Sequence, residues 1–281
     1  MYIIFKYFRF ILPHFILKEK ITGRFLMKKL EDMNEMELQM ERIKAVTAIQ
    51  NCMAHYETVH ISTEFDSMST ECFAMWRPDV SCEVSDWGCI FGPEALQKFW
   101  DAQTTDDAAG GIFFHTLCTP CIEVAGDCKT AKVIWSSAGF ETMPAGVMAP
   151  EAKCFWCWGK YGMDFIRNPE TGEWKIWHMK WFRQIRNDYY VDWYKDSKNT
   201  LKGFPGMDGE SLKLEGSQPS VYHRPYSADT LPSPFPWTPQ PYEHYDGDFR
   251  WVYGGPELEK KYNVNYPAYE KFYNINYPEN I

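Results

Sequence analysis

The segment FFHTLCTPCIEVAGDCKTAKVIW, residues 113–135, decides the fold of this chain. Its β-branched and aromatic residues favour strands, and the Gly-Asp pair at its centre favours a turn. The segment therefore predicts two consecutive strands, 112–126 and 130–142. Two more runs of the same character follow at 152–167 and 173–185, so four long strands are expected in a row.

The residues before this segment predict helices. Residues 28–60 contain no Gly or Pro, and residues 62–76 and 92–103 also favour helices, with a short strand at 79–84 between them. Apolar residues recur at helical spacing in the first helix: Met40, Ile43, Val46, Ile49 and Met53. Helices followed by a run of strands indicate an α+β fold, in which helices pack on one face of a curved antiparallel sheet.

Both ends of the chain differ from this domain, which we place at residues 27–192. Residues 1–26 are apolar but are interrupted by Lys6, Arg9 and Pro13, too early for a membrane span. We expect a non-native extension, with a membrane-surface anchor as the alternative. Residues 193–281 are rich in Pro and Gly but hold too many aromatic residues for a disordered linker. We expect an extended arm that docks on the body or on a neighbouring subunit.

Composition excludes several classes of function. The net charge is −9 without a Lys/Arg-rich run, so a nucleic-acid partner is not expected. Nine cysteines, an odd number scattered along the chain, indicate a reducing, cytoplasmic setting. No glycine-rich phosphate-binding motif is present, and no cofactor is expected.

Two cysteine pairs and His115 are the alternative candidates for the functional site. The pairs Cys118/Cys121 and Cys154/Cys157 lie in strand-like runs, where residues three apart face opposite sides, so no metal is expected and the thiols are assigned to packing or lining. His115 instead shares one face with residues of the concave side. Those expected on its face are Leu117, Thr119, Cys121 and Glu123, with Phe114, Cys118, Ile122 and Val124 facing away.

Other polar residues accompany His115. Tyr56 and His60 lie four apart, on one face of the first helix. Arg183 lies on the last strand, where Trp177, Met179, Trp181 and Ile185 are expected on its side, and it needs a partner or a ligand. The alternatives stay open: a hydrogen-bonded core role for His115 and Tyr56, and an ion pair between Arg183 and Glu141.

Three stretches together resemble the SnoaL-like branch of the nuclear transport factor 2-like superfamily, over about residues 35–190. They are AIQNCMAHYETV, the opening segment and GEWKIWHMKWFR. The opening segment carries the most specific pattern: a His, four residues, a Pro, one more residue, and then IEVxGDxxTAxxxW. The resemblance implies a cone-shaped sheet around a pocket closed by helices, and commonly a homodimer or homotrimer.

The layout is similar to that of bile acid 7α-dehydratases and scytalone dehydratase. This similarity implies catalytic roles for Tyr56, His115 and Arg183, with His60 where the family has an acidic residue and Glu141 near the position of a second acid. We therefore expect a cofactor-free dehydratase with His115 as the base and Tyr56 as the group that polarises a carbonyl. Aromatic residues make up 17% of the chain, and pocket walls rich in Trp, Phe and Met suit an apolar polycyclic substrate (a steroid, polyketide or aromatic system). Residues assigned to substrate binding are Phe114, Trp135, Glu141 and Trp181.

Two other functions remain open. An enone isomerase would need a base and an oxyanion donor but no leaving group. In a non-catalytic ligand-binding or assembly protein, His115 and Tyr56 would serve only as hydrogen-bonding groups of the interior.

Overall fold

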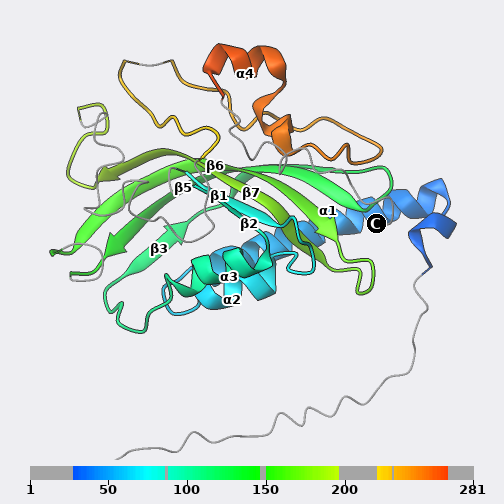
Figure 1. Cartoon of the computed structure of the whole chain (residues 1–281), viewed down its shortest axis with the longest axis horizontal. Coiled ribbons are helices and arrows are strands. Elements are labelled where there is room, and N and C mark those ends of the chain that lie inside the picture. The colour runs from blue at the N-terminus through cyan, green and yellow to red at the C-terminus, as the bar shows by residue number, and fades with distance from the viewer. Residues whose placement is uncertain (1–27, 86–87, 146–149, 196–219, 230, 265–281) are drawn as a thin grey trace, which may run out of the picture.

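A curved seven-stranded sheet forms the middle layer of the protein, with α1, α2 and α3 on its concave side and α4 with the C-terminal segment on its convex side (Figure 1). The structure is a computed structural model and describes residues 28–85, 88–145, 150–195, 220–229 and 231–264. The helical elements are η1 (Leu30–Asp32), α1 (Glu35–Thr58), α2 (Phe65–Cys72), α3 (Pro93–Asp101), η2 (Phe249–Tyr253) and α4 (Pro256–Tyr262). The strands are β1 (Ser81–Val84), β2 (Cys89–Phe91), β3 (Ile112–His115), β4 (Cys118–Val124), β5 (Thr130–Met143), β6 (Lys153–Arg167) and β7 (Trp174–Asp188). The prediction for residues 1–26 lies outside the described residues.

Helix α1 begins seven residues later than the sequence pattern predicted. Asn34 caps it: the Asn34 side chain accepts a hydrogen bond from Glu37 N at 3.0 Å, and Glu37 accepts one from Asn34 N at 2.8 Å. This reciprocal pair satisfies backbone donors that the first helical turn leaves unpaired. Met40 and Ile43, which the pattern placed on the buried face, are 51% and 64% exposed. The apolar packing of α1 is therefore concentrated toward its C-terminal end, where Ile49 and Met53 are fully buried.

The sheet has the strand order β2-β1-β7-β6-β5-β3. Strand β4 also pairs with β5, along residues 131–136, whereas β3 pairs with residues 139–142. Neighbouring strands run antiparallel except β1 and β7, which are parallel, so the antiparallel prediction fails at that one pair.

The predicted strand 112–126 is two strands, β3 and β4, divided at residues 116–117, and β4 itself bulges between Cys118 and Cys121. Thr119 takes a left-handed conformation with φ 45° there. An extra residue in a strand reverses the faces of all residues beyond it. Ile122 and Val124 consequently pack toward the core, contrary to the prediction that they face away from His115.

Two irregularities also change the alternation in β7. Trp158 pairs with Ile185 while Gly159 pairs with Arg183, so Gln184 is an extra residue. As a result Arg183 and Arg186 are both buried and both face the interior of the cone. A second irregularity near His178 turns Trp177 away from this face. Trp177 instead packs with Ala74 and Ile166, so its predicted grouping with Arg183 is wrong.

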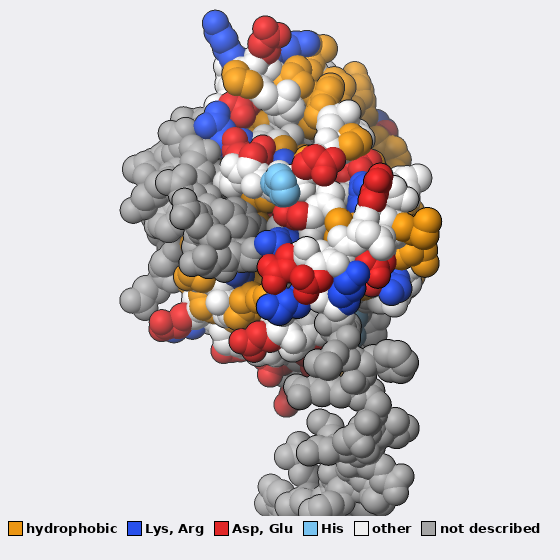
Figure 2. Space-filling view, turned by 90° about the vertical axis from the view of Figure 1, so that its right-hand side faces the viewer, with side chains coloured by type: hydrophobic (Ala, Val, Ile, Leu, Met, Phe, Trp, Pro, Cys, Tyr) orange, Lys and Arg blue, Asp and Glu red, His pale blue; other side chains and the backbone are white. Residues whose placement is uncertain are grey.

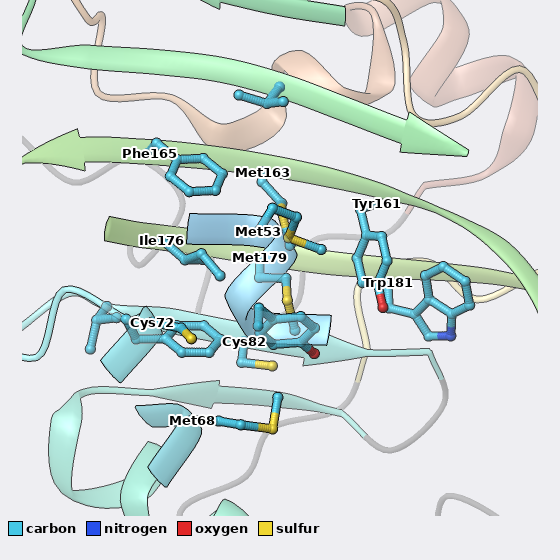
Figure 3. Packing of buried hydrophobic residues seen from close by; sticks show 14 of the residues in the cluster. Met53, Met68, Cys72, Cys82, Tyr161, Met163, Phe165, Ile176, Met179 and Trp181 are labelled. Atoms are coloured by element: carbon cyan, nitrogen blue, oxygen red, sulfur yellow. The ribbon is translucent and has the colours of Figure 1, made fainter. Parts of the chain in front are cut away.

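The core on the concave side is built from sulfur-containing and aromatic side chains. Figure 3 shows Met53, Met163 and Met179 clustered beneath the strands, with Tyr161 beside Trp181. The Tyr161 and Trp181 ring centroids are 4.5 Å apart. Flexible thioethers fill the irregular gaps between large rings. This packing supports the polar side chains that point into the interior of the cone.

The C-terminal segment, of which the structure describes residues 220–229 and 231–264, packs against the convex face of the sheet. Asp164 on β6 is fully buried and accepts hydrogen bonds from His178 Nδ1 and Trp251 Nε1, both at 2.8 Å, and from the Tyr245 hydroxyl. A Cβ on Gly162 would approach Val252 Cγ1 to 2.9 Å, so β6 needs a glycine where this segment crosses it. An apolar cluster seals the contact: Cys89, Phe182, Val221, Tyr222, Phe235, Phe249, Val252 and Tyr253.

The described surface mixes charges of both signs. Figure 2 shows acidic and basic side chains interspersed over one face, without a patch of a single sign. None of the described helices has both the length and the apolar character that a membrane crossing requires.

Candidate active site

A small cavity lies inside the cone, between the helices and the strands β3, β5, β6 and β7. Its volume is about 60 Å³. Aromatic side chains from the helices form one wall: Tyr56, Phe65, Phe99 and Trp100. Polar and charged side chains also line it: His60, Gln103, His115, Glu141, Arg183 and Arg186. Predicted site residues that the structure brings together here are Tyr56, His60, His115, Glu141, Trp181 and Arg183.

His115 ends β3 and is held by a carboxylate. Its side chain is 5% exposed, and Nε2 donates to Glu141 Oε1 at 3.1 Å. Glu141 in turn forms an ion pair with Arg186, with Arg186 Nη2 2.5 Å from Glu141 Oε2. This Arg–Glu–His chain fixes the imidazole ring and leaves Nδ1 as its other hydrogen-bonding atom. The alternative left open for Glu141 was an ion pair with Arg183, and its ion pair in the structure is with Arg186.

These contacts separate the ionisation of the two partners. Burial raises the pKa of Glu141, but the charge of Arg186 and the bond from His115 outweigh it and hold that pKa well below its ordinary value. Burial lowers the pKa of His115, but hydrogen bonds with Cys157 and Glu141 outweigh it and hold that pKa well above its ordinary value. At neutral pH the pair is therefore a carboxylate and an imidazolium.

His60 lies in an aromatic cage beside His115. Its ring stacks on Tyr56, with centroids 5.6 Å apart, and lies 5.0 Å from the His115 ring. Phe65 and Phe113 contact its edges. Burial and the neighbouring charge of His115 lower the pKa of His60 to about 3, so His60 is neutral at pH 7.

Glu57 is an acidic residue beside His115 that the resemblance to the dehydratases did not predict. It follows Tyr56 directly on α1, whereas the resemblance predicted an acid about one turn further on. Burial raises the pKa of Glu57 to about 7, against the opposing charge of His115 and a hydrogen bond from Tyr161. A carboxyl group poised near neutral pH is suited to accept and release a proton.

Glu57, His60 and His115 lie close together, and each has a side-chain atom without a hydrogen-bond partner among the described residues. One polar atom from each of the three lies within 4.8 Å of the other two. Glu57 Oε1, His60 Nδ1 and His115 Nδ1 are sealed from solvent and have no hydrogen-bond partner in the described part of the chain. A buried polar atom without a partner costs about 1–3 kcal/mol. Buried polar atoms without a partner call for an explanation, such as a catalytic role or a bound ion or water.

Two residues assigned to substrate binding do not line the cavity. Phe114 lies on the other face of β3, where it is 50% exposed and stacks on Phe140. Trp135 is buried in the core and packs edge-on against Phe165. The physical reason for Phe114 is strand alternation, because a neighbour of an inward-facing His115 must point outward.

All nine cysteines are free thiols. Cys157 lines the cavity next to His115, as the lining role predicted. Cys118 and Cys154 are exposed, so the packing role predicted for them is wrong.

Three residues of this site were not predicted from the sequence: Glu57, Arg186 and Tyr161. Glu57 was overlooked because an acid was sought one turn beyond Tyr56. Arg186 was overlooked because the extra residue in β7 cannot be seen in the alternation. Tyr161 could have been found, since it falls on the same inward face of β6 as Cys157.

Comparisons with known proteins identify the domain. The chain matches the SnoaL-like domain over residues 41–180. Among curated proteins, no sequence matches the chain.

Three of the solved structures to which the chain is similar illustrate the low identity of these matches. A candidate scytalone dehydratase from Novosphingobium aromaticivorans is 16% identical, with a TM-score of 0.44 over 55% of this chain and 93% of that one. The hexachlorocyclohexane dehydrochlorinase LinA-type3 from Novosphingobium barchaimii is 15% identical, with a TM-score of 0.41 over 55% and 96%. A protein of unknown function from Mycobacterium tuberculosis is 22% identical, with a TM-score of 0.37 over 50% and 77%.

Proposed function

We propose that this chain, whose residues 41–180 belong to the SnoaL-like domains of the nuclear transport factor 2-like superfamily, is a cofactor-free dehydratase. It would remove water from a position β to a carbonyl in an organic small molecule. The observation that carries this proposal is the grouping of Glu57, His60 and His115, each with a buried polar atom that has no partner among the described residues. His60 and His115 of this group line the cavity.

The electrostatics of the site support a division of roles between two groups. Glu57, with a pKa near 7, would take the proton from the carbon next to the carbonyl. His115, protonated through its bond to Glu141, would give a proton to the departing hydroxyl. A pair of groups whose surroundings push their pKa values apart is a common basis for such acid–base assignments. From the sequence we expected His115 to be the base. We now propose it as the acid, because its bond to the Glu141 carboxylate raises the pKa of His115.

Other groups of the cavity support the same reaction. Tyr56 lines it and would donate to the carbonyl oxygen as negative charge develops there. Arg183 lines it too and would orient a carboxylate of the substrate. His60, neutral and held between rings, would hydrogen-bond the reacting group.

The size of the cavity bears on the substrate. Pockets for drug-sized ligands typically measure about 300–1,000 Å³, and the cavity here measures about 60 Å³. It has room for the reacting end of a compact molecule. A polycyclic substrate would enter only after wall side chains such as Phe65 and Phe113 move. We therefore propose a compact β-hydroxy carbonyl compound before the polycyclic class. The same small volume favours the non-catalytic alternative, in which the polar groups only stabilise the interior.

Two further expectations stay predictions. They are a homodimer or homotrimer, and a cytoplasmic location.

A substrate panel tests the proposal. Purified protein would be incubated with compact β-hydroxy acids and ketones, and separately with hydroxylated steroids and polyketides, and loss of water would be followed by mass spectrometry. We expect turnover that falls at least about 100-fold in His115→Ala and Glu57→Gln, since general acid–base groups contribute roughly 10²–10⁴-fold. The matched control is His55→Ala, a surface histidine of the same helix paired with Glu71.

The outcomes separate the alternatives. Undiminished turnover in both variants would remove Glu57 and His115 from the mechanism. Migration of a double bond without loss of water would establish the isomerase. Binding of panel compounds without any turnover would establish the non-catalytic protein.

A further inference from the structure

We propose that Glu57, His60 and His115 also form a binding site for one divalent transition-metal ion, and that the bound ion switches the active site off. The switch rests on the proposed function, because the metal would occupy the atoms assigned to proton transfer. The binding itself does not depend on that function.

The ligand set is the first argument. Two imidazoles and one carboxylate are common ligands of zinc and of other first-row divalent metals. The three ligand atoms lie within 4.8 Å of one another. Metal–nitrogen and metal–oxygen distances near 2.1 Å place neighbouring ligand atoms roughly 3–3.5 Å apart. Side-chain rotations that move these atoms by about 1 Å would bring them to the separation that one bound ion requires.

Unsatisfied atoms are the second, independent argument. Glu57 Oε1, His60 Nδ1 and His115 Nδ1 are shielded from solvent and lack hydrogen-bond partners among the described residues. The His115 side chain is 95% buried, since 5% of it is exposed. One ion would satisfy an atom from each residue at once, which no single side chain of the wall does.

The surroundings of the three residues match those of a metal site. Metal-binding imidazoles usually donate their other ring N–H to a carboxylate, which fixes the ring. His115 does so through Nε2 to Glu141, and Glu141 is held by Arg186. The ion would displace the Nδ1 proton of the His115 imidazolium, which would be released to solvent. Tyr161 hydrogen-bonds Glu57, the carboxylate of the set. The adjoining cavity of about 60 Å³ leaves room for water in an open coordination position.

A second group shares His115 but is a poorer site. His115, Glu141 and Cys157 also bring ligand atoms within 4.8 Å of one another. Glu141 in that group is already neutralised by the Arg186 guanidinium 2.5 Å away, whose charge repels a cation. The nitrogen-rich set with Glu57 is therefore the one that we assign, and its imidazoles favour Zn²⁺ or Co²⁺ over Mg²⁺.

Metal binding would be measured on the full chain after treatment with a chelator. Titration with Co²⁺ should produce visible absorption bands, and calorimetry with Zn²⁺ should show one equivalent bound per chain. Mg²⁺ should produce no binding. Glu57→Gln and His60→Ala, with circular dichroism to establish folding, should each weaken Zn²⁺ binding at least tenfold. His55→Ala should leave it unchanged, and Cys157→Ser should weaken it less than either Glu57→Gln or His60→Ala.

Several results would overturn the site. These are no Zn²⁺ binding by the wild-type chain, unchanged affinity in both Glu57→Gln and His60→Ala, or a loss confined to Cys157→Ser. Glu57→Gln is nearly isosteric and keeps the test decisive if His60→Ala fails to fold.

Activity is a separate measurement. Turnover by the metal-free chain that falls as Zn²⁺ saturates the site supports the switch, and turnover that saturating Zn²⁺ leaves unchanged overturns it. Stoichiometric binding lost in Glu57→Gln, with no turnover in either state, supports the metal site and removes the proposed function.

Discussion

Glu141 connects two charges, because it accepts hydrogen bonds from both His115 and Arg186. Glu141→Gln would keep the shape of the side chain and remove its charge. We expect the pKa of His115 to fall and dehydration to slow by about 100-fold or more, since the acid would be lost. Steady-state kinetics would measure the effect. Glu94→Gln, which breaks an exposed pair with Lys98 on α3, is the control. Equal rates in the two variants would contradict the role of Glu141.

Single residues were predictable where their type and spacing carried the signal. Tyr56 and His60 lie four apart on a helix, so their shared face followed from helical geometry. Glu57 was not predictable as a partner of His115, because an adjacent helical residue points about 100° away. Only the packing of α1 against Tyr161 and His115 brings its carboxylate into the site.

Among the elements, β3 and β5 approach unusually closely where His115 is mounted. Gly139 pairs with His115, and a Cβ there would lie 2.1 Å from Phe114 O and 2.7 Å from His115 Cδ2. Gly139→Ala should therefore push β3 away and cost about 1–3 kcal/mol of unfolding free energy. Urea denaturation would measure the cost. The adjacent Ala138→Ser on the other face should cost less than 1 kcal/mol, and an equal loss in the two variants would contradict the account of this contact.

Elements were predictable in kind but not in register. Periodicity distinguishes helices from strands, and all four predicted long runs are strands, the first of them in two parts. Alternation cannot reveal an extra residue, so the bulges near Thr119 and Gln184 were invisible. These bulges decide that Val124 faces the core and that Arg186 reaches Glu141.

At the scale of the whole molecule, the C-terminal segment forms the third layer. We propose that this segment belongs to the folded unit and not to a separate appendage. Asp164→Asn would remove the buried charge that accepts from His178, Tyr245 and Trp251. We expect a loss of about 1–3 kcal/mol and faster proteolysis after residue 193. The exposed Asp192→Asn is the control, and a stable, protease-resistant Asp164→Asn would contradict the proposal.

The architecture as a whole followed from the order of helices and strands, because few layer arrangements bury the apolar faces of such elements. The volume of the cavity did not follow. It depends on how Phe65, Trp100 and Phe113 fill the cone, which no pattern in the sequence determines. The polycyclic substrate was expected from the abundance of aromatic residues, many of which pack with one another.

Histidine titration tests the central claim most directly, since it requires no substrate. Nitrogen-15 NMR of the metal-free full chain would follow the His115 and His60 rings from pH 4 to 9, with His60→Gln and His115→Gln used for assignment. We predict that His115 stays protonated well above pH 6.5 and that His60 stays neutral throughout. Two rings that both titrate near pH 6.5 would contradict an enclosed site with Glu141 fixing the charge of His115.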